Sequence, residues 1–338
     1  MRNKRQSPLI SVFIIFTIAV FLILLSVSLI RLFGKSIWDG KRRITLVMQN
    51  LPQQDDILSD YLGIFTIEPE KKNALYILIP GNTLLDVPYG YKKFPSASVY
   101  RLGELDQKRG GGKLLAKSTE ISFGYSTEGF MVEYKKTPSL IPKSQEELRE
   151  LKSKYFSLFG LFSGFSDLLA WRGNTVTNFS FVDRFRLWRA IGRLRLDQIR
   201  FLNLSNSPIL KMEKQVDGSE VYELDKDNLD LTVADNFQDS SIRQERITVE
   251  IANATGQEKM AAAYGRILEN MGIHVIVKST AVYEQKEECL LYLGDESLKN
   301  NIIVKRLEEI YRCRMGSDKR DKADRSDIKA VIGEGFIK

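Results

Sequence analysis

The α/β character of this chain is clearest in residues 247–277, which read ITVEIANATGQEKMAAAYGRILENMGIHVIV. Ile247, Val249 and Ile251 alternate with polar residues, a pattern typical of a half-buried strand. Apolar residues then recur at helical spacing, and Gly272 stands where a helix commonly ends. A second apolar run follows the glycine. The stretch therefore predicts a strand, a helix and another strand.

A second unit of the same kind follows. Strand-like runs at 289–293 and 328–332 flank a helical pattern whose apolar face includes Leu307 and Ile310. Strands that alternate with helices indicate an α/β fold. We therefore expect residues 245–338 to form a small C-terminal α/β domain built from two β-α-β units.

A larger α/β domain is expected before it. Runs rich in branched and aromatic residues at 44–48, 61–67 and 74–79 predict strands. We expect this domain to cover residues 43–205. Residues 206–244 are acidic and polar, which predicts a linker between the two domains.

The N-terminal part of the chain predicts a membrane anchor. Residues 9–30 carry no charged side chain, and about 20 apolar residues suffice for a helix to cross a bilayer. We expect a single transmembrane helix at 9–30, with residues 1–8 in the cytoplasm. A cleaved secretory signal is the alternative, but its apolar core is usually shorter, and residues 29–32 (LIRL) are a poor cleavage site.

The positive-inside rule does not orient this helix, because basic residues flank it on both sides. Before it stand Arg2, Lys4 and Arg5, and after it stand Arg31, Lys35, Lys41, Arg42 and Arg43.

Composition argues against several kinds of site. Cys289 and Cys313 make no metal-binding pattern and no disulfide framework. The single histidine, His274, lies in an apolar strand-like run, which argues against zinc sites and histidine-based nucleophilic triads. The formal net charge of +7 fits a protein that faces anionic lipid or anionic polymer. A charge of this size does not single out any one partner.

One charged stripe suggests a binding surface. A helix expected over residues 183–196 carries Arg186, Arg189 and Arg193 away from its apolar face. Arginine binds phosphate and carboxylate through two parallel hydrogen bonds. The stripe predicts either a solvated charged face or contact with an anionic lipid head group or polymer.

The ordered motifs of the C-terminal region resemble the C-terminal domain of LytR/CpsA/Psr envelope proteins. The matching features are the strand, the Asn253–Gly256 turn, a helix that begins with small residues at 260–262, and the glycine before the next strand. The ending VIGEGF at residues 331–336 is similar to the terminal strand and turn of that domain.

The preceding region resembles a degenerate copy of the family's catalytic domain. Residues 58–60 (LSD) fall where the family has Arg-Ser-Asp. Residues 79–83 (IPGNT) fall where it has Ile-Pro-Arg-Asp-Thr. In the family, these arginines and aspartates hold a polyprenyl-pyrophosphate lipid and a divalent metal while glycopolymer is transferred to the cell wall.

The resemblance implies that the site has lost its phosphate-binding groups. Leu58 and Gly81 occupy both arginine positions, Asn82 replaces an aspartate, and Asp60 is retained. Each lost charge-assisted hydrogen bond removes roughly 1.5–3 kcal/mol. This pattern favours a protein that binds over one that transfers.

We therefore expect a single-pass membrane protein with its bulk outside the cytoplasm, acting as a non-catalytic binding or scaffolding relative of glycopolymer transferases. We expect no cofactor. The expected partners are the bilayer and a cell-wall polymer, a polyprenyl-phosphate lipid or an envelope protein, and not nucleic acid. The alternative is an active phosphotransferase that uses Asp60, magnesium and the arginines near Arg186. A third possibility is an anchored cytoplasmic regulator.

Overall fold

The computed structural model describes residues 17, 36–51, 61–106, 108–134, 141–156, 175–282, 284–316 and 325–336. The expected membrane anchor at 9–30 lies outside these ranges, apart from Thr17. Within the ranges given, no helix is both long enough and apolar enough to cross a bilayer.

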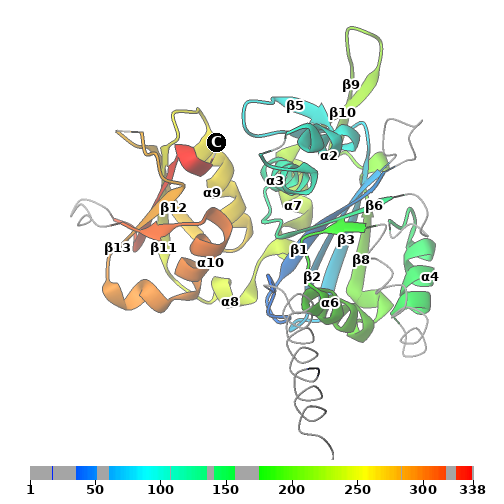
Figure 1. Ribbon diagram of the computed structural model, residues 1–338, viewed down its shortest axis with the longest axis horizontal. Coiled ribbons are helices and arrows are strands. Elements are labelled where there is room, and N and C mark those ends of the chain that lie inside the picture. The colour runs from blue at the N-terminus through cyan, green and yellow to red at the C-terminus, as the bar shows by residue number, and fades with distance from the viewer. Residues whose placement is uncertain are drawn as a thin grey trace, which may run out of the picture.

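The first domain is built on a six-stranded sheet in the order β7-β6-β1-β2-β3-β8 (Figure 1). β2 runs antiparallel to both of its neighbours, β1 and β3, while β6 joins β1 and β8 joins β3 in parallel. The expected mixed α/β fold is thus confirmed for this domain. The strands are β1 (Ile44–Leu51), β2 (Tyr61–Glu68), β3 (Asn73–Pro80), β6 (Gly129–Tyr134), β7 (Thr175–Thr177) and β8 (Ile199–Asn203).

Helices cover both faces of this sheet, so the domain has three layers and two cores. Because side chains alternate along a strand, Val47 of β1 packs in the core under α2, α3 and α7, while Leu46 packs in the core under α6. The helices are α2 (Ser96–Leu105), α3 (Gly111–Phe123), α4 (Gln145–Tyr155), α6 (Phe181–Arg193) and α7 (Lys226–Phe237), with a small ribbon of β4 (Leu84–Asp86) and β5 (Lys93–Pro95) beside α2.

Two helices of the first domain begin at side-chain caps. The Ser144 hydroxyl accepts a hydrogen bond from the backbone N–H of Glu147 at 3.1 Å, at the start of α4. The helix expected over 183–196 is α6. It begins earlier, because Ser180 and Asp183 form a capping box.

The expectation of a linker at 206–244 was wrong. Leu229, Val233 and Phe237 recur at every fourth position of α7 and are buried in the first core. The acidic residues between them masked this apolar stripe in the sequence. The segment also contains β9 (Leu210–Lys214), β10 (Glu220–Leu224) and α8 (Ser240–Arg243).

The second domain is a five-stranded sheet in the order β12-β11-β15-β13-β14. Its strands are β11 (Thr248–Ala254), β12 (His274–Thr280), β13 (Cys289–Leu293), β14 (Arg314–Met315) and β15 (Ile328–Gly333), and its helices are α9 (Met260–Asn270) and α10 (Ile302–Tyr311). The two domains also contain short 3₁₀ turns. These are η1 (Leu196–Gln198) and η2 (Leu204–Asn206) in the first domain, and η3 (Glu296–Asn300) and η4 (Glu334–Phe336) in the second.

The first expected β-α-β unit is present, since β11, α9 and β12 follow one another and the two strands are parallel. The second unit differs from the prediction. It ends on β14, which is parallel to β13, and the expected final strand β15 lies antiparallel to β13 instead. Because β14 has only two residues, its sequence carries no periodic signal.

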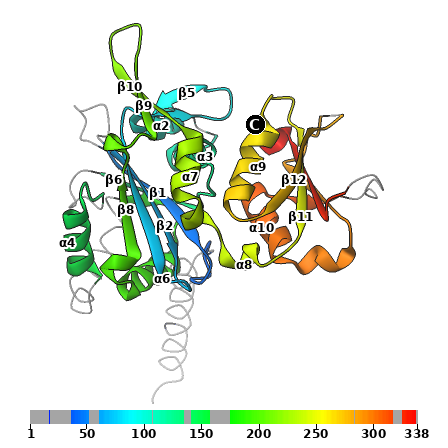
Figure 2. The same ribbon diagram turned by 180° about the vertical axis from the view of Figure 1, so that it is seen from behind.

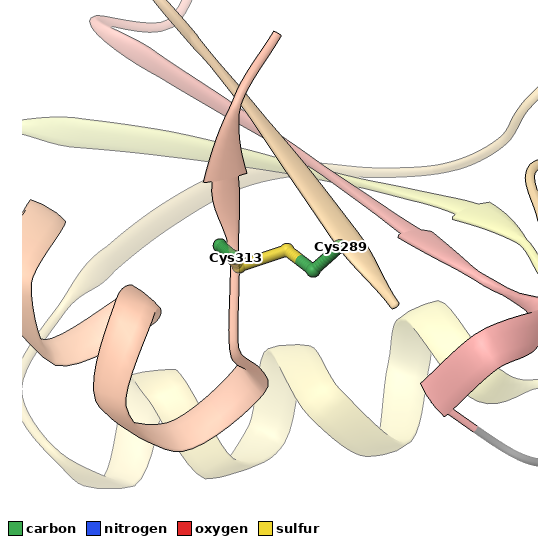
Figure 3. The surroundings of a disulfide bond; sticks show 2 residues. All are labelled: Cys289 and Cys313. Carbon is green, nitrogen blue, oxygen red and sulfur yellow. A yellow bond between two sulfur atoms is a disulfide. The ribbon is translucent and has the colours of Figure 1, made fainter. Parts of the chain in front are cut away.

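The two cysteines form a disulfide, which corrects the expectation from the sequence (Figure 3). Cys289 lies on β13, and Cys313 lies directly before β14. The two strands are hydrogen-bonded neighbours, and this pairing brings together cysteines that are 24 residues apart. The spacing of the cysteines in the sequence alone could not show this.

The two domains pack directly against each other, with α9 beside α3 and α7 (Figure 2). Arg266 of α9 pairs with Asp230 of α7, with Nε and Oδ2 2.6 Å apart. The same guanidinium donates to the carbonyls of Ser122 and Phe123, at 3.2 and 3.1 Å. Arginine is a favourable partner for the free carbonyls at a helix end. These contacts fix the second domain on the end of α3.

Candidate functional site

An apolar cavity lies between the six-stranded sheet and helices α4 and α6. The space that the centre of a water molecule can reach in it is about 80 Å³, and all the space that no atom fills, open solvent included, is about 740 Å³. Lys152 and Arg184 are the charged side chains that line it. The sheet contributes Leu46, Met48, Phe65, Tyr76, Met131 and Ile199, and the other wall contains Pro142, Leu148, Leu151, Phe156, Leu187, Trp188 and Ile191.

The sequence of α4 explains why space remains beneath it. Leu148 and Leu151 form a narrow apolar stripe on an otherwise charged helix, and no residue of α4 is buried. Short helices in proteins gain most of their stability from packing of an apolar face. In the described part of the chain, the apolar face of α4 is therefore only partly covered.

Helix α6 supplies the other side of the cavity. Arg184, Leu187, Trp188 and Ile191 have the spacing of one helical face, and all four line the cavity. The indole N–H of Trp188 donates to the carbonyl of Tyr155 at 2.8 Å, which connects α6 to the end of α4.

Buried polar atoms without partners lie on the cavity face of the sheet. The hydroxyl of Tyr76, which is 1% exposed, forms no hydrogen bond with any residue that the structure describes. Burial raises the pKa of Tyr76 well above its usual value. A side chain at position 63 would stand 2.6 Å from this hydroxyl, so only glycine leaves the space that the ring occupies.

Two further buried atoms without a partner among the described residues lie at the carboxyl end of β1 and on β7, with β6 between these two strands. Asn50 follows Met48 on the same face of β1, and its Oδ1 is buried without a partner, as is Oγ1 of Thr175. Thr175 shares this face because Thr177, two residues along, pairs with the cavity residue Met131. An unpaired buried polar atom costs about 1–3 kcal/mol. Of these three, only Tyr76 lines the cavity, where a ligand or a water molecule would supply the missing partner.

The apolar surroundings of the cavity change the pKa of a charged group beside it. Burial against the apolar wall lowers the pKa of Lys152. A cation in such a place attracts an anionic group more strongly than it would in water, because the local dielectric constant is lower.

The arginine stripe chosen from the sequence does not line this cavity. Arg186 donates from Nη1 to the hydroxyl of Ser36 at 2.8 Å and also to the carbonyl of Trp38, so it holds the segment before β1. Arg189 and Arg193 are exposed. The arginine that faces the cavity is Arg184, which sequence reasoning missed. Its spacing from Leu187 and Ile191 was the available signal.

Four further positions were compared with the family's catalytic motifs. Two of them form structural hydrogen bonds, and two lie outside the described residues. The amide of Asn82 donates to the carbonyl of Glu220 at 2.9 Å and so anchors β10. The carbonyl of Gly81 accepts from the backbone N–H of Ala97 at 2.9 Å. Asp60 and Leu58 fall in the range 52–60, which the structure does not describe.

A metal site is not formed by the residues that the structure describes. Among them, no group of three or more histidine, cysteine, aspartate or glutamate side chains is placed to hold an ion. Magnesium prefers carboxylate and carbonyl oxygens in octahedral arrangement. Near Asn50, the described chain offers the carboxylate of Glu133 on the neighbouring strand, and this donor set does not fit a magnesium ion.

No family model matches this sequence, and no curated protein is significantly similar to it. Solved structures do show similarity. TagT bound to LIIa-WTA is 12% identical with a TM-score of 0.41, over 61% of this chain and 96% of that chain. TagV from B. subtilis is 11% identical with a TM-score of 0.44, over 58% of this chain and 98% of that chain. A transcriptional regulator from Enterococcus faecalis is 11% identical with a TM-score of 0.43, over 71% of this chain and 92% of that chain.

TagT and TagV are enzymes of the LytR/CpsA/Psr family, which is the family that the sequence resembles. At identities and TM-scores this low, the likeness says nothing about the chemistry of this chain.

Proposed function

We propose that this chain binds a polyprenyl-phosphate lipid in the cavity beneath α4 and α6, as a non-catalytic relative of glycopolymer transferases of the cell wall. The observation that carries the proposal is the cavity itself. Among the described residues that line it, only Lys152 and Arg184 are charged. An isoprenoid chain is wholly apolar and would cover these walls, while its phosphate would meet a guanidinium.

The position of the cavity relative to the expected anchor supports access to lipid. Asp183 of α6 accepts hydrogen bonds from the Ser36 hydroxyl at 2.5 Å and from the Trp38 N–H at 3.2 Å. Five residues separate Ile30 from Ser36, and the six Cα–Cα steps between these two residues reach at most about 22 Å when fully extended. Helix α6, which walls the cavity, would thus lie close to the end of a span at 9–30.

Two observations support an outward-facing location. Disulfides persist mainly in oxidising compartments outside the cytoplasm, and Cys289 and Cys313 form one. In addition, Arg43 is buried and pairs with Glu68, and Arg42 pairs with Glu309. Two of the five basic residues after the expected span therefore serve the fold and do not count as membrane-flanking charges.

The same contacts favour binding over transfer. A rearranged transferase site would draw on Arg186, but this guanidinium is engaged by the segment before β1. Arg184 is then the cavity arginine, and among the described residues Lys152 is the one other cation that lines the cavity. Stabilising the charge that develops on a pyrophosphate during transfer requires several preorganised donors.

Filling the cavity should abolish lipid binding. We expect Leu151→Trp to lower the affinity of the full chain for polyprenyl phosphate in detergent by at least about tenfold, or about 1.4 kcal/mol, because the indole occupies the space of the isoprenoid. Leu231→Trp on α7 is the matched control, since Leu231 is 86% exposed and lies away from the cavity. Titration with a fluorescent polyprenyl phosphate measures the affinity of each variant for the lipid. Equal affinity in the two variants would contradict the proposal.

A further inference from the structure

The outer face of α6 is both basic and apolar. Phe185, Arg189 and Arg193 stand at every fourth position of this helix, so they share one face. The opposite side of the helix is buried in the core against the sheet, through Leu187 and Ala190. Phe185 is 39% exposed, and both arginines are exposed as well. This face is distinct from the apolar cavity, because none of its three residues lines that cavity.

The two arginines of this face are available to an anion from outside. Within the part of the chain that the structure describes, neither guanidinium forms a hydrogen bond or an ion pair. The acidic residue of α6, Asp183, is buried and accepts hydrogen bonds from Ser36 and Ser180. The exposed face therefore carries positive charge that no carboxylate of the same helix neutralises.

The basic and apolar surface continues past the end of α6. Leu196 of η1 is 38% exposed. Arg195, directly before it, is exposed and pairs with Asp197 at 2.7 Å. Leu196 and Arg195 border a hollow that they share with the exposed Arg149 of α4. Bulky apolar side chains among exposed arginines are typical of a helix that lies in the interface of a bilayer.

The segment of the chain that comes before β1 is held on the same helix. Nη1 of Arg186 donates to the hydroxyl of Ser36 at 2.8 Å, and Asp183 accepts from the N–H of Trp38 at 3.2 Å. Five residues separate Ser36 from the end of the anchor expected at 9–30. An anchor there would keep α6 beside the bilayer.

A bilayer with anionic head groups suits this face better than a soluble acidic protein does. A short tether raises the effective concentration of the lipid surface at α6, whereas a soluble partner would have to be captured from solution. Anionic head groups attract arginine over roughly a Debye length, about 8 Å at physiological salt. Phe185 and Leu196 can enter the boundary between head groups and acyl chains, where aromatic side chains are enriched.

We propose that the outer face of α6 binds the anionic surface of the bilayer through Phe185, Arg189 and Arg193. This contact fixes how the first domain stands on the membrane. Helix α6 lies at the end of the domain opposite the ribbon of β9 and β10 (Figure 1), so the ribbon would point away from the bilayer. The contact is separate from the lipid proposed for the apolar cavity and does not depend on it.

Fluorescence quenching in lipid nanodiscs tests the contact in the full chain. The two cysteines of the chain are bonded to each other, so an introduced cysteine is the one thiol available to a fluorophore. We place it by Leu196→Cys beside α6, or by Val216→Cys at the fully exposed turn of the ribbon. A lipid with a nitroxide on its head group is the quencher. We expect quenching at position 196 to be several-fold stronger than at position 216 in nanodiscs that contain phosphatidylglycerol. It should weaken when phosphatidylcholine replaces that lipid, because this head group has no net charge.

Reversing the two arginines tests which side chains make the contact. Arg189→Glu with Arg193→Glu should remove most of the difference between the two lipids at position 196. The melting temperature should stay unchanged, since both side chains are exposed and unpaired within the described residues. Lys299→Glu with Lys305→Glu is the matched control, because it makes the same change of net charge on exposed lysines of the second domain.

Three outcomes would overturn the inference. The first is equal quenching at positions 196 and 216. The second is strong quenching at position 196 that is the same with both lipids, which would mean that the tether alone holds α6 near the bilayer. The third is an equal loss in the control variant. The cavity variant Leu151→Trp should leave the quenching unchanged, so failure of the cavity proposal and failure of this one are distinguishable.

Discussion

Replacing Arg43 with alanine is expected to destabilise the first domain by about 3–5 kcal/mol, because it leaves a buried carboxylate without its cation. Arg43 and Glu68 are 5% and 3% exposed at their side chains, and Nη2 lies 2.5 Å from Oε2. Burial lowers the pKa of Arg43, and the adjacent Glu68 carboxylate opposes that change.

The guanidinium of Arg43 also holds neighbouring parts of the fold. Its Nε donates to the carbonyl of Gln238 at 3.1 Å, just after α7. The partner carboxylate of Glu68 accepts from the hydroxyl of Ser240 at 2.6 Å, at the start of α8. The ion pair therefore joins β1 and β2 to the segment that leads into the second domain.

Urea unfolding of the single and double variants measures this effect. Arg43→Met with Glu68→Leu should recover most of the loss, since apolar replacement of a buried pair is often nearly neutral. A loss below about 1 kcal/mol for Arg43→Ala would mean that the pair is hydrated like a surface ion pair.

Removing the disulfide is the second large effect. We expect Cys289→Ser with Cys313→Ser to cost about 3 kcal/mol, because the bond closes a loop across a separation of 24 residues and limits the unfolded chain. The bond also ties the short strand β14 to the sheet, where only two residue pairs hold it to β13.

Thermal unfolding with and without a reductant measures the contribution of the disulfide. The reductant should lower the melting temperature of the unaltered chain and leave that of the serine variant unchanged. Reactive thiols in the denatured, unreduced protein would show that the bond is not formed. That result would favour the anchored cytoplasmic regulator.

The sequence predicted those strands and helices whose apolar residues recur at regular spacing. The strand and helix of β11 and α9 follow from alternation and helical spacing, and the start of α4 follows from Ser144 and Glu147. Helix α7 was missed, because Leu229, Val233 and Phe237 form a thin stripe among acidic residues.

Features that depend on long-range contacts could not be predicted. The disulfide depends on β13 and β14 becoming neighbours, and the central place of β15 depends on its pairing with both β11 and β13. The apolar cavity is formed by strands and helices far apart in the chain. The sequence suggested arginine on α6, but choosing Arg184 over Arg186 required knowing which side of the helix faces the sheet.

Photo-cross-linking tests the central claim most directly. The full chain in detergent is incubated with magnesium and a photoreactive polyprenyl pyrophosphate, and both the cross-linked residues and the released phosphate are measured. We predict cross-links in α4 and α6, at residues such as Leu151 and Ile191 that line the cavity, without release of phosphate. Cross-links confined to exposed surfaces, or phosphate release that is lost in Asp60→Ala, would contradict a lipid-binding protein without transferase activity.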